Sequence, residues 1–129
     1  MKKMVLLFSH NLTASQKEDI HDSLKVTEVI SLPPELQALW SQVPTDRDLI
    51  FADYMSGVER FLMDSLDSGD FVLIQGDFGA TYYMVNFVKM QGFIPLYSVN
   101  KRIAREFIED GIVKKYSEFK HEFFREYES

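Results

Sequence analysis

One junction, residues 71–81, constrains the fold of this chain more than any other stretch. The apolar run Phe71–Ile74 breaks into a loop with Gly76 and Gly79, and the apolar segment Tyr82–Met90 follows directly. This order predicts a strand, a tight loop and a helix. Such a junction places backbone N–H groups at the carboxyl end of a sheet, where anions bind. We therefore expect the loop to form the floor of a ligand site.

Similar alternations of strand and helix patterns surround this junction. Strands are predicted at Val5–Phe8, Val26–Leu32 and Phe93–Val99, and helices at Thr13–Lys25, Pro34–Trp40 and Thr45–Gly69. The first helix begins with a capping-box spacing. Alternating strands and helices indicate a mainly parallel sheet with right-handed crossovers. If the second and third strands flank the first, the loops after the first and third strands diverge at a switch point, where ligands bind.

The C-terminal segment has a different pattern. Asp110-Gly111 separates two runs with β-branched and aromatic residues, which is a hairpin signal. The alternation from Phe119 to Tyr127 predicts a final strand. The expected fold is therefore α/β: a mainly parallel sheet flanked by helices, with a C-terminal β-hairpin, in a single domain of residues 1–129.

Composition excludes several classes of protein. A chain of 129 residues with 46% apolar residues is large enough for one core. The absence of cysteine excludes disulfides, thiolate catalysis and cysteine zinc sites. Histidines at 10, 21 and 121 are too widely spaced to indicate a metal site, so no cofactor is expected. The N-terminal apolar run is too short for a signal peptide and no run suits a membrane span, so we expect a cytoplasmic protein.

The charge is unevenly distributed. A net charge of −6 argues against a protein that binds long nucleic acids. Residues 101–125 nevertheless carry seven Lys or Arg against five Asp or Glu, a balance of +2 that leaves −8 on the remainder. An anionic ligand would have to be small and held locally.

Three successive polar residues follow the first predicted strand. Ser9, His10 and Asn11 offer a hydroxyl, an imidazole and an amide at the mouth of the expected site. The chain has no Gly-x-Ser-x-Gly elbow, which argues against a serine hydrolase. A histidine imidazole can carry a proton, which makes His10 a candidate proton carrier, although a histidine in a polar loop often only donates and accepts hydrogen bonds.

The glycine loop matches neither common nucleotide motif. It lacks the GxGxxG pattern and the Gly-Lys-Ser/Thr ending of a P-loop, so dinucleotides and nucleoside triphosphates are not indicated. Asp77 would repel phosphate, and it either caps the following helix or accepts a hydrogen bond from a ribose or an adenine. A tight turn with Asp77 as an ordinary cap is the simpler interpretation. The candidate ligand-binding residues of the loop are Gln75, Gly76, Asp77, Phe78, Gly79, Ala80 and Thr81.

Basic residues follow the fourth predicted strand. Asn100, Lys101 and Arg102 are expected in a loop at the same sheet edge, where the two cations would clamp phosphate. A solvated loop is the alternative. His121 and Arg125 share one face of the last predicted strand, which points either to ligand or to solvent.

These residues also carry a family resemblance. The segment from Leu73 to Tyr82, the segment Gly92–Tyr97 and the closing residues Phe119–His121 and Phe124–Tyr127 resemble small stand-alone CRISPR-associated proteins of the Csx series. The segments Leu6–His10 and Leu36–Trp40 fit as well. Such proteins are similar to the CARF superfamily of Rossmann-like domains, which usually form dimers that bind cyclic oligoadenylate across a two-fold axis.

The resemblance implies a ring nuclease that degrades cyclic tetra-adenylate, the messenger of type III CRISPR defence. In that chemistry a ribose 2′-hydroxyl attacks the adjacent phosphorus without a metal and leaves a 2′,3′-cyclic phosphate. Ser9 and Asn11 match the polar ligand loop, with His10 as a candidate base. Lys101 and Arg102 match the basic position expected to stabilise the transition state. His121 and Arg125 match the closing motif, to which the resemblance assigns no role.

Two alternatives to the nuclease remain open. A cyclic-nucleotide sensor or sponge would need the same pocket without cleavage. A Rossmann-like interaction scaffold would need no nucleotide at all.

Overall fold

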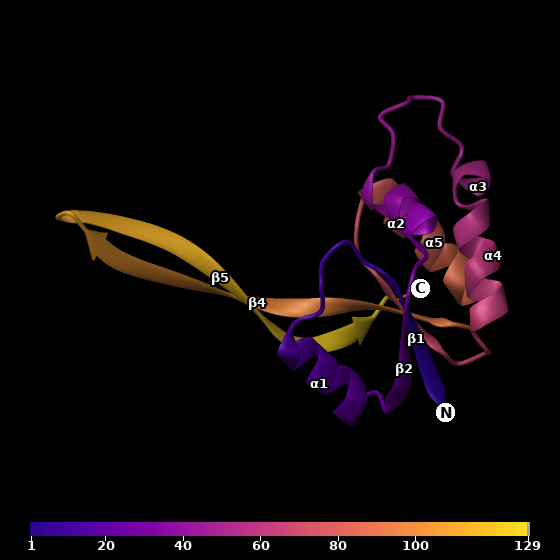
Figure 1. Ribbon diagram of the computed structural model, residues 1–129, viewed down its shortest axis with the longest axis horizontal. Helices are drawn as coiled ribbons and strands as arrows, with labels where there is room; N and C mark the ends of the chain where they lie inside the picture. Colours follow the sequence, from indigo (N-terminus) through magenta and orange to yellow (C-terminus); the bar gives the residue numbers. More distant parts are fainter. Residues whose placement is uncertain (129) are drawn as a thin grey trace.

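The computed structural model describes residues 1–128 and has one five-stranded sheet with helices on both faces (Figure 1). The strand order is β2-β1-β3-β4-β5. The strands are β1 (Lys2–Leu7), β2 (Val26–Ser31), β3 (Phe71–Ile74), β4 (Ile94–Glu109) and β5 (Ile112–Glu126). The helices are α1 (Ala14–Asp22), α2 (Pro34–Ser41), α3 (Phe51–Tyr54), α4 (Ser56–Ser65) and α5 (Phe78–Met90).

The sheet is mixed, because four strands are parallel and the last is antiparallel. β1 pairs in parallel with β2 and β3, β3 pairs in parallel with β4, and β5 runs antiparallel to β4. β2 and β3 therefore flank β1, which confirms the predicted divergence of the loops after β1 and β3. Helices α1 and α5 leave this point toward opposite faces of the sheet.

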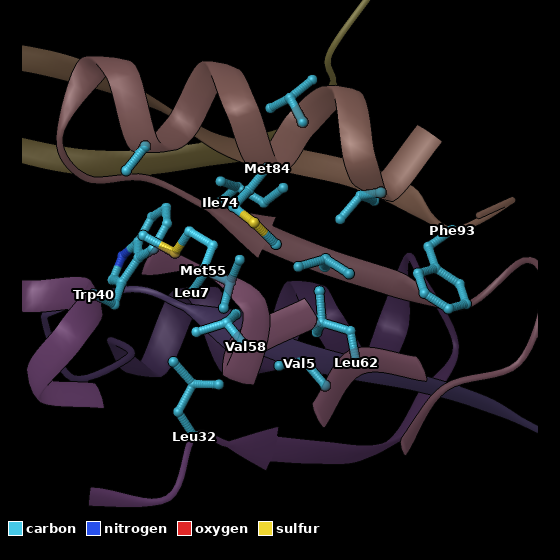
Figure 2. Packing of buried hydrophobic residues seen from close by; sticks show 14 of the residues in the cluster. Val5, Leu7, Leu32, Trp40, Met55, Val58, Leu62, Ile74, Met84 and Phe93 are labelled. Carbon is cyan, nitrogen blue, oxygen red and sulfur yellow. The ribbon is translucent and has the colours of Figure 1, made fainter. Parts of the chain in front are cut away.

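Period-two alternation within the strands builds a core on each face of the sheet. Val5 and Leu7 of β1 point to one face, where Val72 and Ile74 of β3 join them beneath α4 and α5 (Figure 2). Met4 points to the other face, where Ile20 of α1 packs in the second cluster. Parallel strands covered on both faces are expected to read as continuous apolar runs, as these do.

The helix predictions are confirmed in part. Thr13 and Gln16 form the predicted capping box at the start of α1. The single helix predicted from Thr45 to Gly69 is wrong, because α3 and α4 are separate and begin later. The Asp46 carboxylate accepts a hydrogen bond from the Asp48 amide at 3.0 Å. Such a local side-chain bond favours a turn over a helix.

The C-terminal hairpin is confirmed but is much longer than predicted. Asp110 and Gly111 both have positive φ, 52° and 77°, as a two-residue type I′ turn requires. β4 continues without interruption to Glu109, so Lys101 and Arg102 lie inside a strand, and their predicted place in a loop is wrong. No glycine or proline interrupts β4 after Pro95. The hydrogen-bonded pairing of β4 with β5 therefore continues to Glu109, beyond the part of β4 that pairs with β3. Figure 1 shows the distal half of this hairpin projecting away from the body.

A β-bulge lies where the hairpin leaves the body. Val99 pairs with Phe123 and Asn100 pairs with His121, so Glu122 is the extra residue of β5. An extra residue reverses the face to which the following side chains point. The bulge therefore turns His121 toward α1, on the same face as Phe124.

Candidate functional site

Two adjoining hollows open at the carboxyl end of β1. The smaller, about 430 Å³, lies between the end of β1, helix α2 and the loop after β3. The larger, about 710 Å³, lies between β1, β2, α1 and α2, and Lys17 is the cation that lines it. Phe8, Ser9, His10 and Ser41 line both hollows. The predicted polar loop therefore stands at their junction, and Asn11 lines the larger one.

Helix α2 holds the cleft wall in place through side-chain hydrogen bonds. Gln37 Nε2 donates to the Phe8 carbonyl at 3.1 Å and to Ser41 Oγ at 2.9 Å. Ser41 Oγ lies 2.9 Å from Ser9 Oγ. Trp40 is 1% exposed and its indole N–H donates to the Gln75 carbonyl at 3.2 Å. The loops after β1 and β3 are thus tied to one helix.

Gly76 is the point where the loop after β3 passes closest to Trp40. A Cβ at this position would lie 3.0 Å from three atoms of the indole ring. A Cβ here would force the loop or the indole ring to shift by a few tenths of an ångström, so a glycine is the residue that fits this close approach. Gly76 lines the cleft as predicted from the sequence.

Several other residues of the predicted loop are engaged within the protein. Gln75 accepts a hydrogen bond from the Ser98 amide at 2.8 Å through its side-chain oxygen. Asp77 caps α5 by accepting from the Ala80 amide at 3.0 Å. A Cβ on Gly79 would meet the Phe51 ring at 3.1 Å, and the Ala80 side chain is buried in the core. Asp77 therefore serves as a helix cap, and Ala80 offers no side-chain surface to a ligand.

Aromatic side chains continue the cleft beyond Gly76. Phe78 is 94% exposed at the start of α5. A third hollow of about 290 Å³ connects Gln75 and Gly76 to Phe78, Thr81, Tyr97 and Tyr127. Thr81 Oγ1 is buried there and has no hydrogen-bond partner within residues 1–128. The hollow thus combines the exposed aromatic ring of Phe78 with the Thr81 hydroxyl, which forms no hydrogen bond within residues 1–128.

The hairpin extends this wall with cations. Side chains alternate along β4, so Lys101 lies on the same face as Tyr97. Lys101 stands directly opposite Lys120, and neither has an ion-pair partner within residues 1–128. Arg125 lies over the rings of Tyr97 and Phe123, at 5.8 and 5.3 Å from the centroids. We call Tyr97, Lys101, Lys120, Phe123 and Arg125 the basic face.

Arg102 and Asn100 point away from the basic face. Arg102 Nε donates to Ser117 Oγ at 2.9 Å on the opposite side of the hairpin. Asn100 accepts from Ser98 Oγ at 2.9 Å. The three basic-loop residues predicted together are thus divided between two faces of one strand, and only Lys101 joins the cleft side.

His121 is buried in a hydrogen-bond network on the α1 side of the sheet. Its Nδ1 lies 2.6 Å from Ser98 Oγ, and its Nε2 lies 2.7 Å from the Asp19 carboxylate. Gln16 also donates to Ser98 Oγ at 3.3 Å. Ser98, His121 and Asp19 are connected in the order of a hydrolase triad. Ser98 is only 6% exposed, however, and its hydroxyl is hydrogen-bonded to His121, Gln16 and Asn100, so it is not accessible to a substrate. This network anchors the hairpin base to α1.

Sequence reasoning missed three parts of the site. Trp40 is the core or lid anchor that the sequence suggests, but no local pattern indicates that Gln37 and Ser41 beside it in α2 form a wall of the cleft. Lys120 and Tyr97 belong to the basic face, but strict alternation places Lys120 on the face opposite Arg125, and only the bulge at Glu122 brings the two cations to one face. The Asp19 partner of His121 carried no sequence signal at all.

Burial changes the pKa of one phenol at the site. Tyr127 donates to the Ile74 carbonyl at 2.6 Å, and burial, with Tyr97 nearby, raises its pKa. Residues 1–128 contain no cluster of three His, Cys, Asp or Glu side chains placed to hold a metal. Within the same residues, no helix is both long and apolar enough to cross a membrane.

Comparisons with known proteins identify one family. A family model described as "Uncharacterized protein MJ1673 family" matches residues 2–125. The chain is 50% identical over 127 residues to "Uncharacterized protein MJ1673" of Methanocaldococcus jannaschii, covering 98% of each chain. No solved structure is significantly similar to this chain.

Proposed function

We propose that this chain, which belongs to the MJ1673 family, is a ring nuclease that degrades cyclic oligoadenylate in type III CRISPR defence, with cyclic tetra-adenylate favoured. The observation that carries the proposal is the continuity between the polar cleft and the basic face, which share Gln75 and Gly76 through the hollow that ends at Tyr97. A ligand with several bases, riboses and phosphates needs a surface of this mixed kind. Aromatic rings stack on bases, and cations bind phosphates. The proposal includes a Rossmann-like, CARF-type domain in a cytoplasmic homodimer.

The Lys101–Lys120 pair supports an anionic ligand. Like charges directly opposite each other across two strands are destabilising. Glu118, an acid on the same face, is bonded instead to Arg105 at 2.9 Å. A phosphate near the two ammonium groups would relieve their repulsion. Because the whole chain carries −6, such a local site suits a small anion better than a long nucleic acid.

The proposed reaction needs positioning and charge stabilisation and no metal. A ribose 2′-oxygen attacks the adjacent phosphorus and the bond to the 5′-oxygen breaks, which leaves a 2′,3′-cyclic phosphate. His10 accepts the proton of the 2′-hydroxyl, and Lys101 stabilises the negative charge on the phosphorane. The leaving 5′-oxygen takes up a proton from solvent water and departs as a hydroxyl. Arg102 has a smaller part, since it is bonded to Ser117 on the other face.

The decisive experiment uses cyclic tetra-adenylate in EDTA. With the protein in excess, the ligand is expected to be converted to linear products with 2′,3′-cyclic phosphate ends. Chromatography of the mixture over time measures this conversion. Intact ligand under these conditions would overturn the proposal.

Matched variants separate catalysis from binding. A His10→Ala change removes the base and is expected to slow cleavage about 10²-fold or more while binding remains. A Lys101→Ala change is expected to lower both rate and affinity, and Arg102→Ala to do so less. Lys89→Ala is the control, because Lys89 lies in the last turn of α5, far from the cleft end of that helix.

A second candidate, a sensor or sponge, is favoured by one observation. Asp77 is committed to capping α5, which leaves His10 as the free acid–base group among the residues of the smaller hollow. Tight binding with unchanged ligand over hours would establish this function. A scaffold without nucleotide function would show no binding heat in calorimetry.

A further inference from the structure

The larger hollow lies on the face of the sheet that α1 covers. Helices α2, α4 and α5 all pack on the other face, in the core that includes Trp40, Leu62 and Met84. The α1 face has one helix of nine residues, which is about 14 Å long at about 1.5 Å per residue. Ile20 of α1 packs against Met4 in the middle of the sheet. The carboxyl ends of β1 and β2 are therefore left open, and the hollow of about 710 Å³ lies there.

The floor of this hollow is apolar and open to solvent. Parallel pairing sets Val29 of β2 beside Met4 of β1, on the face toward α1. Val29 is nevertheless 42% exposed, and Leu6 and Phe8, which also line the hollow, are only partly buried. Sites for small molecules typically have volumes of about 300–1,000 Å³ and such an apolar lining. A flat apolar group of a ligand would cover the side chains that α1 does not reach.

The charge on the wall of the hollow is positive. Lys17, near the start of α1, lines it and has no ion-pair partner within residues 1–128. Among the same residues, no Asp or Glu lines the hollow. The acids of α1 lie on the other side of that helix, where Glu18, Asp19 and Asp22 line a separate hollow beside β5. Although the chain carries −6, this separation makes the larger hollow favourable for an anion.

Much of the remaining lining is neutral and polar. Asn11, Ser31 and Gln37 each present an amide or a hydroxyl there. The Gln37 amide nitrogen donates to the Phe8 carbonyl and to Ser41, which holds the side chain in place. Neutral amides and hydroxyls both donate and accept hydrogen bonds, so they suit the hydroxyls of a sugar and the polar edge of a base.

We infer that the larger hollow binds a nucleoside 5′-monophosphate, with the base on the floor of Leu6, Phe8 and Val29 and the phosphate on Lys17. Such a ligand combines a flat base that stacks on an aromatic ring, a sugar with hydroxyls and a strong anion. Each part meets the matching part of the lining. The inference concerns binding alone and does not depend on cleavage in the neighbouring cleft.

The probe is 5′-AMP, titrated into the full-length chain. Calorimetry measures the affinity, and NMR shifts of the backbone amides locate the site. The largest shifts are expected at Leu6, Lys17 and Val29, with small shifts at Lys101 of the hairpin. Adenosine and inorganic phosphate each provide only part of the contacts, so each is expected to bind about tenfold or more weakly than 5′-AMP.

Variants at exposed positions test the role of charge. Lys17→Ala is expected to weaken 5′-AMP binding about tenfold or more and to leave adenosine binding unchanged, while Lys17→Arg keeps the affinity. Ser31→Glu adds a carboxylate to the lining and is expected to weaken 5′-AMP binding more than adenosine binding. Lys89→Ala removes the same charge in the last turn of α5 and is the control.

Three results would each overturn the inference: native 5′-AMP affinity in Lys17→Ala, equal binding of adenosine and 5′-AMP, or amide shifts confined to the hairpin. Cleavage of cyclic tetra-adenylate is measured on the same preparations. Intact cleavage without 5′-AMP binding would refute this inference alone. Binding of 5′-AMP in the hollow without cleavage would refute the nuclease alone, so the two proposals fail separately.

Discussion

The anchor between His121 and α1 allows a quantitative prediction. Both ring nitrogens of His121 are bonded, to Ser98 Oγ at 2.6 Å and to the Asp19 carboxylate at 2.7 Å, and the residue is 8% exposed. A His121→Ala change removes both bonds and the contact of the ring with Phe124, whose centroid is 4.4 Å away. The hairpin base then loses its polar connection to α1.

The expected cost follows from the partners. A hydrogen bond to a charged group contributes about 1.5–3 kcal/mol and a neutral bond about 1 kcal/mol. Ser98 keeps Gln16 and Asn100 as partners, so little is added for an orphaned hydroxyl. We expect His121→Ala to lower the free energy of unfolding by about 2–4 kcal/mol. The same helix provides a control: His21 lies 2.8 Å from Asp22, but its side chain is 80% exposed, so His21→Ala should cost less than about 1 kcal/mol.

Urea denaturation followed by circular dichroism measures both variants. A double-mutant cycle with Asp19→Asn isolates the pair, and a coupling energy of about 1 kcal/mol or more is expected between groups in direct contact. Equal losses for His121→Ala and His21→Ala would refute the anchoring argument. So would additive effects of the Asp19 and His121 changes.

Three smaller predictions concern single elements. Asp77→Ala removes the cap of α5 and is expected to cost about 0.5–2 kcal/mol in urea unfolding. Gly111→Ala forces a side chain into positive φ and should speed amide exchange in the distal part of the hairpin, residues 103–118, while exchange in β1 stays unchanged. Burial raises the pKa of Tyr127, so its contribution to stability is full below the usual tyrosine value of about 10 and is lost as pH rises further. The Tyr127→Phe variant should therefore lose less stability than the native chain in alkaline unfolding.

Local signals were sufficient for much of this fold. The capping box at Thr13, the Asp110-Gly111 turn and the strand–loop–helix junction at Gly76 all depend on residues close in sequence, and the structure has each of them. The parallel order followed from alternating apolar runs, because crossover connections leave few topologies. The incorrect prediction of a helix from Thr45 also has a local cause. The Asp46 carboxylate accepts a hydrogen bond from the Asp48 backbone amide, which favours a turn there instead of a helix.

What the tertiary structure alone decided is where distant side chains meet. His121 turns to Asp19 because one extra residue, Glu122, shifts the ladder, and a one-residue shift reverses the face to which side chains point. Lys101 faces Lys120 only through the register set by a turn nine residues away. Trp40 closes the cleft because α2 packs back over the end of β3. The sequence by itself therefore determined the elements and their order, while register and packing, which join residues far apart in the chain, decided the composition of the site.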